Sequence, residues 1–549
     1  MHENPSLLPA STLALIATFT LLALATPGCS DTLRGDTSSI TLTDDVTTEA
    51  NGSCASSCGG YGGNGCYCDA ACETYGDCCP DACSQCGYDC ALSGAVCAYG
   101  SSDCNPYVPD VIASANTIHR HGDIMGYHMG SYPDVSSSDH WQGIQRLPVI
   151  AGTGLDGRYL VVSSDHADFS RYAVVKMASR STGGARLRSN RLSYGTNTWD
   201  VTPPSSDVVA YTGTISSLRR HASGIQTIGR YLLVPAEDND DVYNAQAFFY
   251  DMANPLAPVH VWGYTLIHPD AGGGAIAKLD DGHYLMAIAR YDADVLDFYL
   301  SSNPSITAPG WSLLDTWYKS EIQCAPGMDC SWGSYQAINL VTDATGTLYL
   351  VASHRTILGS NDWVDTFRLD ISGNGTSTVT KVAKRNLVCS AGYPRQCDLL
   401  AAGGTYVDDN HQLMYYATEH DNDGPGGTVK MVEFRQERPT TSCTSLNNSW
   451  VDFFEHSSFD GRSLMLDYLD RGKRRTYNWN DLDNFNDRAS SVRWCLPTGQ
   501  RMRVYRHDSY GGGYYDLTGN GAVRSDSTLH DNDFSDGKDV GDNISSATW

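Results

Sequence analysis

The feature that most constrains the fold is a pattern repeated five times along the chain: a turn residue, an apolar strand, an acidic loop and a second strand. Self-similarity at a spacing of about 50 to 70 residues, with several strands per unit, is typical of β-propeller blades. The repeats begin at Gly157, Gly229, Gly282, Gly346 and His411. The sequence therefore predicts a mostly β protein with a β-propeller over residues 105–438, five blades being favoured and six the alternative.

A short segment rich in small residues precedes each repeat and is predicted to be the innermost strand of its blade. Glycine suits a strand that other backbones approach closely, as they do at a propeller axis. These segments begin at His140, His221, His268, Ser334 and Asp398. Two close cysteine pairs are predicted to staple loops of the propeller: Cys324 with Cys330, and Cys389 with Cys397.

Acidic residues follow the apolar strand in nearly every repeat. In a propeller these loops open on the same face as the starts of the innermost strands, so carboxylates and three histidines are predicted to ring one mouth of the channel. The candidate binding residues are His140, His221, His268, Asp165, Glu237, Asp238, Asp292 and Glu419, with Asp168, Asp240, Asp241, Asp294, Asp421 and Asp423 in the same loops.

Three interpretations of this ring stay open. The carboxylates can be turn residues, with the histidines bonded to backbone at the strand starts. The ring can be a binding funnel for a glycan or a cation. It can also be catalytic, because five-bladed propellers include glycoside hydrolases that use paired carboxylates at the channel mouth. No motif selects two of the carboxylates, so the sequence assigns no catalytic residue.

Ten of the nineteen cysteines fall between Cys54 and Cys90, in a segment with almost no aliphatic residues. Disulfides are expected to replace hydrophobic burial there, each contributing roughly 2 to 4 kcal/mol. The cysteine order, with the stretch CYCDAAC and an adjacent pair, resembles the somatomedin-B family. The eight cysteines that fit are Cys54, Cys58, Cys66, Cys68, Cys72, Cys78, Cys79 and Cys86.

The resemblance implies a compact disulfide knot that contacts other proteins, and a rigid spacer is the alternative. Four more cysteines lie outside the family's pattern and are predicted to form two further bridges on the side of the next domain. They are Cys83, Cys90, Cys97 and Cys104, so the whole module covers residues 54–104.

The N-terminal segment predicts export. Residues 12–26 form an apolar stretch that is short for a membrane span but suits the core of a signal peptide. The stretch TPGC ending at Cys29 looks like a bacterial lipobox, and removing Cys29 by lipidation leaves an even number of cysteines. Cleavage after Ala25 is the alternative. Residues 30–53, rich in Ser, Thr and Asp, are predicted to be a flexible tether.

The last hundred residues contain a duplicated pattern that predicts two Greek keys packed as one β-sandwich over residues 443–549. Each copy has an aromatic-rich hairpin with a glycine, Gly461 or Gly512, followed by a polar stretch ending in Ser-Ser. This arrangement resembles the βγ-crystallin family. Cys443 and Cys495 are predicted to bridge within the domain.

The βγ-crystallin resemblance implies calcium binding, because Asp, Asn and Ser side chains and backbone carbonyls supply the hard oxygen ligands that calcium prefers. Asp487 with Ser490 in one arc and Asp542 with Ser545 in the other are the expected ligands, with Asn486 beside the first pair. Carbonyls near His456 and His507 would complete the sites. The alternative is a Greek key kept only as a stable fold, without an ion.

Net charge and cysteine content limit the kinds of binding partner and the compartment in which the protein works. The net charge of −26 disfavours nucleic acid and anionic lipid surfaces, and nineteen cysteines indicate an oxidising compartment. The favoured interpretation is a bacterial cell-surface lipoprotein or secreted protein of adhesion type, a binding protein rather than an enzyme. It would bind calcium and an extracellular protein or glycan, and would meet the membrane only through a lipid anchor. The alternative is an extracellular glycan-active hydrolase acting at the propeller mouth.

Overall fold

The computed structural model describes residues 53–54, 57–63, 66–69, 71–72, 78–79, 81–87, 91–118, 122–130, 140–179, 203–238, 242–308, 310–355, 362–387, 389, 397–400, 402–420, 427–436, 443–446, 449–467, 476–478 and 485–549. The chain divides into two compact units, residues 1–49 and 50–549. The predicted signal peptide, Cys29, the tether up to residue 52 and Cys90 lie outside the described residues. Among the described residues, no helix is long and apolar enough to cross a bilayer.

The N-terminal module is a small knot in which cysteines replace an aliphatic core. Strands β1 (Gly60–Gly63) and β2 (Cys66–Cys68) form an antiparallel hairpin, and helix α2 (Ala82–Cys86) follows. The eight cysteines that fit the family pattern pair with one another, as Cys54–Cys68, Cys58–Cys86, Cys66–Cys79 and Cys72–Cys78. The other disulfides in the described residues also match predicted cysteines: Cys97–Cys104, Cys324–Cys330, Cys389–Cys397 and Cys443–Cys495.

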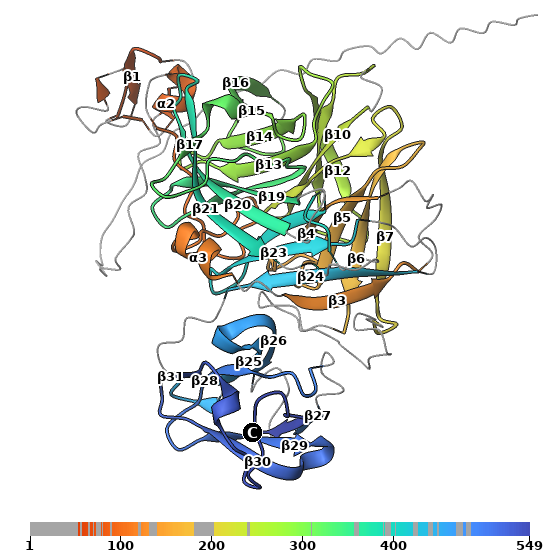
Figure 1. Cartoon of the computed structure of the whole chain (residues 1–549). Helices are drawn as coiled ribbons and strands as arrows, with labels where there is room; N and C mark the ends of the chain where they lie inside the picture. The colour runs from red at the N-terminus through yellow and green to blue at the C-terminus, as the bar shows by residue number, and fades with distance from the viewer. Residues whose placement is uncertain are drawn as a thin grey trace, which may run out of the picture. The chain divides into compact units, whose positions relative to one another are not determined.

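Four-stranded antiparallel units form five blades of a propeller, the first and fifth joined into one eight-stranded sheet by a parallel pair of β3 (Asp123–His128) and β7 (Asp207–Ser216), which confirms the repeat-based prediction (Figure 1). Strands follow chain order from the axis outward in the first four blades, apart from the short β17 (Gln323–Cys324) at the outer edge of the fourth. The second strand of each blade is apolar and buried along nearly its whole length, because neighbouring blades cover both of its faces.

The first blade consists of β4 (Trp141–Arg146), β5 (Tyr159–Ser164), β6 (Ser170–Met177) and β7 (Asp207–Ser216). The second consists of β8 (His221–Ala222) with β9 (Gln226–Ile228), β10 (Tyr231–Glu237), β11 (Gln246–Asp251) and β12 (Val259–Thr265). The third consists of β13 (Gly273–Lys278), β14 (Tyr284–Arg290), β15 (Val295–Ser301) and β16 (Trp311–Tyr318). The fourth blade consists of β18 (Ala337–Thr342), β19 (Leu348–Arg355), β20 (Asp362–Ile371) and β21 (Ser377–Leu387), with β17 (Gln323–Cys324) at its edge. The fifth consists of β22 (Gly403–Val407), β23 (Leu413–Thr418), β24 (Thr428–Arg435) and β3 (Asp123–His128).

The ring closes through a strand from the start of the propeller segment. Strand β3 pairs antiparallel with β24 and supplies the outermost strand of the fifth blade, so segments about three hundred residues apart lie side by side (Figure 1). Closure of this kind leaves no free blade at the two ends of the repeat array.

The segment 91–108 seals the end of the channel away from the predicted histidine mouth. Its backbone bonds to the turns of three blades, including Gly94 N–H to the Gly346 carbonyl and Val108 N–H to the Thr342 carbonyl. Asp103 accepts from Lys278 Nζ at 2.8 Å; burial favours the neutral carboxyl, but Lys278 and the other hydrogen-bond donors together lower the pKa of Asp103. Helix α3 (Val111–Thr117), capped by the Asp110 side chain, then leads toward β3.

Glycines allow the backbones of the innermost strands to pack closely at the propeller axis. A Cβ on Gly224 would lie inside van der Waals contact with the backbone carbonyl of Gln336, whereas a Cβ on Gly272 would meet nothing closer than 3.9 Å. We expect Gly224→Ala to lower the free energy of unfolding by about 3 kcal/mol through overpacking, and Gly272→Ala to change it little. Chemical denaturation of the two variants measures the difference; equal stabilities would show that the axis is loosely packed.

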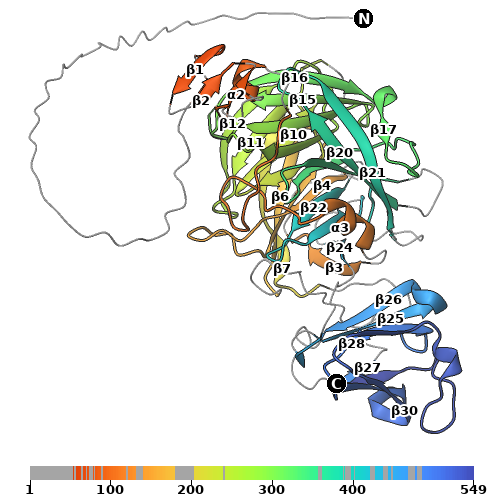
Figure 2. The same ribbon diagram turned by 90° about the vertical axis from the view of Figure 1, so that its left-hand side faces the viewer.

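The C-terminal domain is a Greek-key sandwich of two four-stranded sheets (Figure 2). One sheet is ordered β26 (Asp460–Asp467), β25 (Trp450–His456), β28 (Ser491–Cys495) and β31 (Val523–Asp526); the other is β27 (Thr476–Asn478), β32 (Ser546–Thr548), β29 (Arg501–His507) and β30 (Gly511–Thr518). Each sequence copy thus gives its third strand to the other copy's sheet. The two copies share one apolar core around Val492, Val504 and Trp494.

Candidate functional site

The propeller mouth is formed where the innermost strands begin and the second strands end. In the second blade, His221 at the start of β8 lies opposite Glu237 at the end of β10. In the first blade, Trp141 pairs with Ser164, so His140 and Asp165 extend the same ladder. The structure thus brings together four of the predicted residues from two adjacent blades.

Each of these histidines is held by a carboxylate. His140 Nδ1 lies 3.1 Å from Asp165 Oδ2, and His221 Nδ1 lies 2.9 Å from Glu237 Oε1. Burial favours the neutral carboxyl at both acids, but the hydrogen bond and charge of the paired histidine prevail and lower the pKa of Asp165 and of Glu237. Both acids are therefore carboxylates at neutral pH, with the imidazole rings oriented by them.

Gln142 joins the two pairs. Its side-chain amide lies 2.8 Å from His221 Nε2 and also contacts His140 Nε2, and the residue is fully buried. His420 stacks on His140 with ring centroids 4.3 Å apart. The two imidazoles thus direct their Nε2 atoms to one point in the mouth.

A second pair of acids connects blades two and three. The Asp270 and Glu237 side chains share a hydrogen bond, while Glu237 also accepts from the Ala271 backbone N–H. Burial and the adjacent Glu237 carboxylate raise the pKa of Asp270 to about 7. A carboxyl group with a pKa near 7 exchanges its proton at neutral pH, which is the property required of a general acid. Sequence reasoning missed Asp270, although it lies two residues after the selected His268.

Asp270 is also bonded to a strained turn. Its Oδ2 accepts from the Tyr291 N–H at 2.7 Å. Tyr291, Asp292 and Ala293 have φ of 52°, 56° and 64°, three successive residues in the left-handed region that non-glycine residues avoid. Asp292 anchors the turn because its carbonyl accepts from Tyr335 N–H and its Oδ1 accepts from Gln336 Nε2 at 2.8 Å.

The turn presents one aromatic ring to solvent. The Tyr291 side chain is 58% exposed, and the Arg290 guanidinium carbon lies 5.8 Å from its ring centroid. Sites that store strain of this kind are often functional. Residues 291–293 are therefore the second part of the candidate site.

The other predicted mouth residues do not join these pairs. The His268 carbonyl accepts from Ala245 N–H, outside the histidine pair. Asp238 pairs with Arg220 at 3.5 Å and accepts from Val242 N–H, as turn carboxylates do. Glu419 accepts from Lys430 N–H at 2.8 Å. Asp240, Asp241, Asp421 and Asp423 lie outside the described residues.

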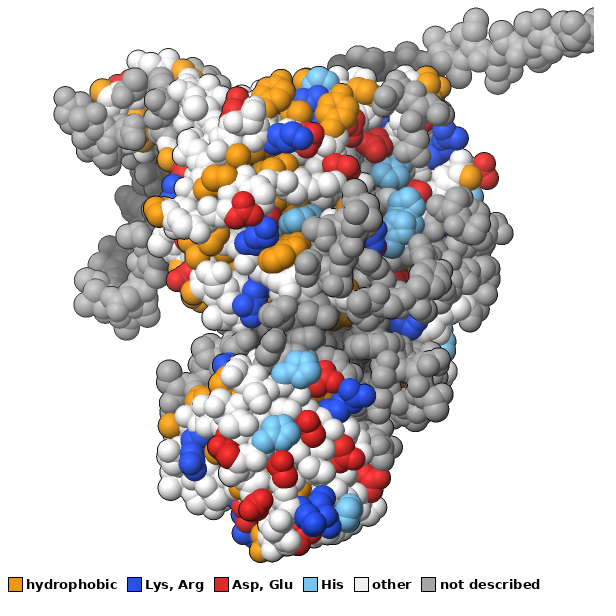
Figure 3. Space-filling model, in the orientation of Figure 1, with side chains coloured by type: hydrophobic (Ala, Val, Ile, Leu, Met, Phe, Trp, Pro, Cys, Tyr) orange, Lys and Arg blue, Asp and Glu red, His pale blue; other side chains and the backbone are white. Residues whose placement is uncertain are grey.

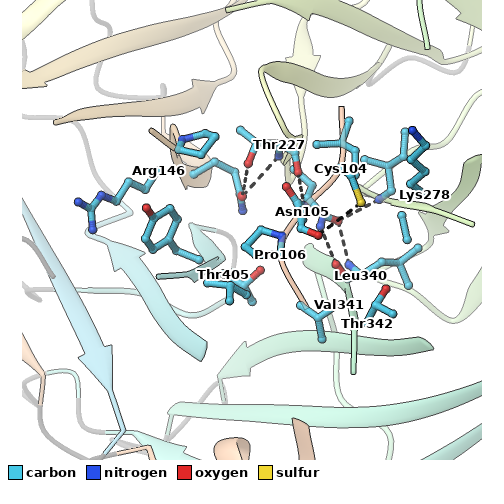
Figure 4. A pocket seen from close by; sticks show the side chains of 18 residues that line it. Cys104, Asn105, Pro106, Arg146, Thr227, Lys278, Leu340, Val341, Thr342 and Thr405 are labelled. Atoms are coloured by element: carbon cyan, nitrogen blue, oxygen red, sulfur yellow. Dashed lines mark hydrogen bonds between the residues drawn. The ribbon is translucent and has the colours of Figure 1, made fainter. Parts of the chain in front are cut away.

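A small cavity of about 30 Å³ lies at the sealed end of the channel (Figure 4). Asn105 closes it by donating from Nδ2 to the Thr227 carbonyl at 2.6 Å and accepting from Gly229 N–H. Arg146 and Lys278, at the far ends of their innermost strands, also line it. The cavity has room for about one or two waters, so it is part of the plug and not of the mouth.

The oxygen atoms predicted to bind calcium converge in two clusters of the C-terminal domain. Ser490 Oγ lies within hydrogen-bonding distance of two acceptors, Asp542 Oδ1 at 2.7 Å and the Glu455 carbonyl at 2.8 Å, which share its single hydrogen. Ser545 Oγ likewise lies within hydrogen-bonding distance of Asp487 Oδ1 at 3.0 Å and of the Arg506 carbonyl at 2.8 Å. Acidic side chains are scattered over the visible face of this domain (Figure 3).

This grouping differs from the one expected from the sequence. The two arcs bond to each other through Asp487 N–H to the Ile544 carbonyl and Asp542 N–H to the Ala489 carbonyl. Each aspartate therefore faces the serine of the opposite arc rather than its own. The carbonyls are those of the residues directly before His456 and His507. Asn486 Oδ1 is buried without a hydrogen-bond partner among the described residues, so the donor set fits an oxygen-seeking cation.

Comparisons with known proteins found likeness in structure alone. No protein-family model matches the chain, and no curated protein matches it. A protein of unknown function from Dyadobacter fermentans is 9% identical, with 74% of this chain and 97% of that chain covered at a TM-score of 0.29. A GH43 β-xylosidase/α-arabinofuranosidase from a compost microbial metagenome is 13% identical, with 56% and 94% covered at 0.30. An exo-β-1,3-galactanase from Phanerochaete chrysosporium is 10% identical, with 78% and 95% covered at 0.31. Scores this low carry no activity over to this chain.

Proposed function

We propose that the propeller mouth hydrolyses glycosidic bonds of an extracellular glycan, with Asp270 as the proton donor and Asp292 as the second carboxylate. The observation that carries the proposal is the position of Asp270 in the mouth, against Glu237 and bonded to the Tyr291 N–H, where burial and the Glu237 carboxylate raise the pKa of Asp270 to about 7. Glycoside hydrolysis needs one carboxylic acid to protonate the leaving oxygen and one carboxylate to act on the other side of the sugar. This follows the alternative that the sequence leaves open and rests on the geometry of the mouth.

The separation of the two groups suits this chemistry. Asp270 Oδ2 lies 2.7 Å from Tyr291 N, and Asp292 is the next residue. Backbone and side-chain dimensions then keep the two carboxyl groups within about 10 Å of each other. Pairs that cleave glycosidic bonds are separated by about 5 to 9.5 Å. Glu237, in direct contact with Asp270, is too close to be the second group and acts as a positioning residue.

Tyr291 gives the site a surface for a sugar ring. It is exposed, and its backbone is fixed by Asp270 on one side and by the Asp292 contacts on the other. An aromatic face with a few fixed polar groups is typical of small-molecule sites. We expect the glycan to lie over Tyr291, between the two carboxyl groups.

The test is the release of new reducing ends from a panel of bacterial, fungal and plant polysaccharides by the full chain. Release that disappears when Asp270 and Asp292 are both replaced by asparagine supports the proposal. A panel that the wild-type chain binds without cleaving would instead favour a glycan-binding funnel.

We propose further that the C-terminal domain binds calcium through the crossed pairs Asp487 with Ser545 and Asp542 with Ser490. Carboxylate, hydroxyl and carbonyl oxygens already converge there, so a cation would replace hydrogen bonds in a preformed cradle. Calcium would then stabilise a surface-exposed domain of a protein that works outside the cytoplasm, in keeping with eight disulfides among the described residues. The somatomedin-B-like knot and the Cys29 anchor are proposed to attach this chain to a protein partner and to the cell surface.

A further inference from the structure

We infer that the loop 325–336, between β17 and β18 of the fourth blade, positions the candidate site by holding the turn 291–293 of the third blade in its left-handed conformation. Trp332 and Gln336 are the positioning residues. The statement about the turn stands without hydrolysis. Its consequence for cleavage rests on the proposed function, in which Asp292 is the second carboxylate.

The loop bonds to the turn at three places. Trp332 Nε1 donates to the Ala293 carbonyl at 3.0 Å. Tyr335 N–H donates to the Asp292 carbonyl at 2.9 Å, and Gln336 Nε2 donates to Asp292 Oδ1 at 2.8 Å. Non-glycine residues with positive φ cost free energy and persist where their surroundings fix them. These three bonds from the neighbouring blade supply such surroundings.

The loop itself is anchored on a buried ion pair of the fourth blade. Lys381 Nζ on β21 lies 2.8 Å from Asp365 Oδ2 on β20, and neither side chain is more than 1% exposed. Lys381 also donates to the Ser331 carbonyl at 2.8 Å, and Tyr335 Oη donates to Asp365 Oδ2 at 2.6 Å. The chain on both sides of Trp332 is therefore tied to the interior of the blade.

Packing adds to this anchoring. The Trp332 ring centroid lies 4.9 Å from that of Trp317 and 4.8 Å from that of Phe367. A Cβ on Gly333 would come within 2.7 Å of the His354 ring, so the loop backbone lies directly on that ring. The loop thus has one well-defined position from which its donors reach the turn.

The same bonds fix the position of the Asp292 carboxylate. Its carbonyl and its Oδ1 both accept from the loop, so one segment sets its backbone and its side-chain torsions. A reacting group displaced by about 1 Å can lower the rate by a factor on the order of 10². Loss of the loop's bonds should therefore lower kcat for cleavage. The pH dependence should stay as in wild type, because no charge beside Asp270 changes.

The experiment is hydrogen–deuterium exchange of the full chain at the turn, where Tyr291 N–H donates to Asp270 and Asp294 N–H donates to the Tyr291 carbonyl. Trp332→Phe keeps an aromatic ring and removes the indole donor. The two amides should then exchange about fivefold faster or more, the factor expected from one lost hydrogen bond.

The matched control is Trp317→Phe. The Trp317 ring packs against Trp332, but its Nε1 has no hydrogen-bond partner among the described residues. Replacing it changes the packing beside the loop to a similar extent and removes no bond to the turn. The turn should therefore exchange as in wild type.

A second variant, Gln336→Met, keeps the test decisive if Trp332→Phe is unstable, since it removes a different donor and keeps the length of the side chain. It should also speed exchange at the turn, and it should lower kcat for cleavage about tenfold or more with KM little changed. Melting temperatures report whether each variant is folded.

The inference is overturned if the turn exchanges at the wild-type rate in both folded loop variants, or if Trp317→Phe speeds exchange as much as Trp332→Phe does. Exchange needs no substrate. A wild-type chain that cleaves no glycan would therefore count against the hydrolase proposal alone, and unchanged exchange would count against the loop alone.

Discussion

Replacing Asp270 by asparagine is expected to lower kcat/KM for glycan cleavage by roughly 10² to 10⁴, the usual contribution of a positioned proton donor. Asparagine keeps the size of the side chain and can still accept from Tyr291 N–H, but it has no acidic proton. Asp292→Asn should cost a similar factor because the second carboxylate is lost. Initial rates of reducing-end release at slightly acidic pH measure both effects.

The matched control is Asp280→Asn. Asp280 is another partly buried acid of the third blade whose pKa is raised, by burial and by the neighbouring Asp281. It lies in the turn between β13 and β14, at the sealed end of the channel, where its N–H donates to the Ser93 carbonyl. Activity should be retained in this variant. Equal losses in the Asp270 and Asp280 variants would mean that folding, not chemistry, explains the effect.

Saturating calcium is expected to raise the melting temperature of the C-terminal domain by about 10 °C or more. A ligand at a hundredfold excess over its Kd stabilises the folded state by about 2.7 kcal/mol per site, and a domain of about 100 residues gains roughly 4 to 8 °C per kcal/mol. Calorimetry of the full chain with calcium and with a chelator measures the shift. Identical transitions in the two conditions would leave the domain as a scaffold without an ion.

The crossed arrangement of the calcium ligands makes a sharper prediction about variants. Asp487→Ala should remove one of two binding events, and adding Ser545→Ala should change little more, since both residues serve the same cluster. Adding Ser490→Ala to Asp487→Ala should remove both events because Ser490 serves the other cluster. If instead Ser490→Ala adds little to Asp487→Ala and Ser545→Ala removes the second binding event, the ligands are grouped by arc, as expected from the sequence.

The fold was largely predictable because its units are repeated and locally encoded. Five apolar second strands predicted five blades, and the resemblance to the somatomedin-B family predicted which eight cysteines pair in the knot, though not their connectivity. The closing strand β3 and the plug 91–108 were not predictable, since each occurs once and acts through pairing with distant turns. Long-range backbone pairing of a single short segment leaves no periodic signal in a sequence.

The candidate site was predictable in part for the same reason. His140, His221, Asp165 and Glu237 sit at equivalent positions of adjacent repeats, so superposing the repeats finds them. Asp270 gains its importance from contact with Glu237 across two blades and from burial. Gln142 matters because two histidines converge on it. Neither contact can be inferred from the order of residues in the sequence.

The central claim, that burial and the Glu237 carboxylate together keep the catalytic proton on Asp270, is tested most directly by the pH dependence of kcat/KM in wild type and in Glu237→Gln. An acid must be protonated to donate, so wild-type kcat/KM should fall tenfold per pH unit above about pH 7, where Asp270 ionises. Glutamine removes the negative charge that raises this pKa, so the decline should move to lower pH by about one unit or more. A decline at the same pH in both proteins, or activity that rises above pH 7, would contradict the account.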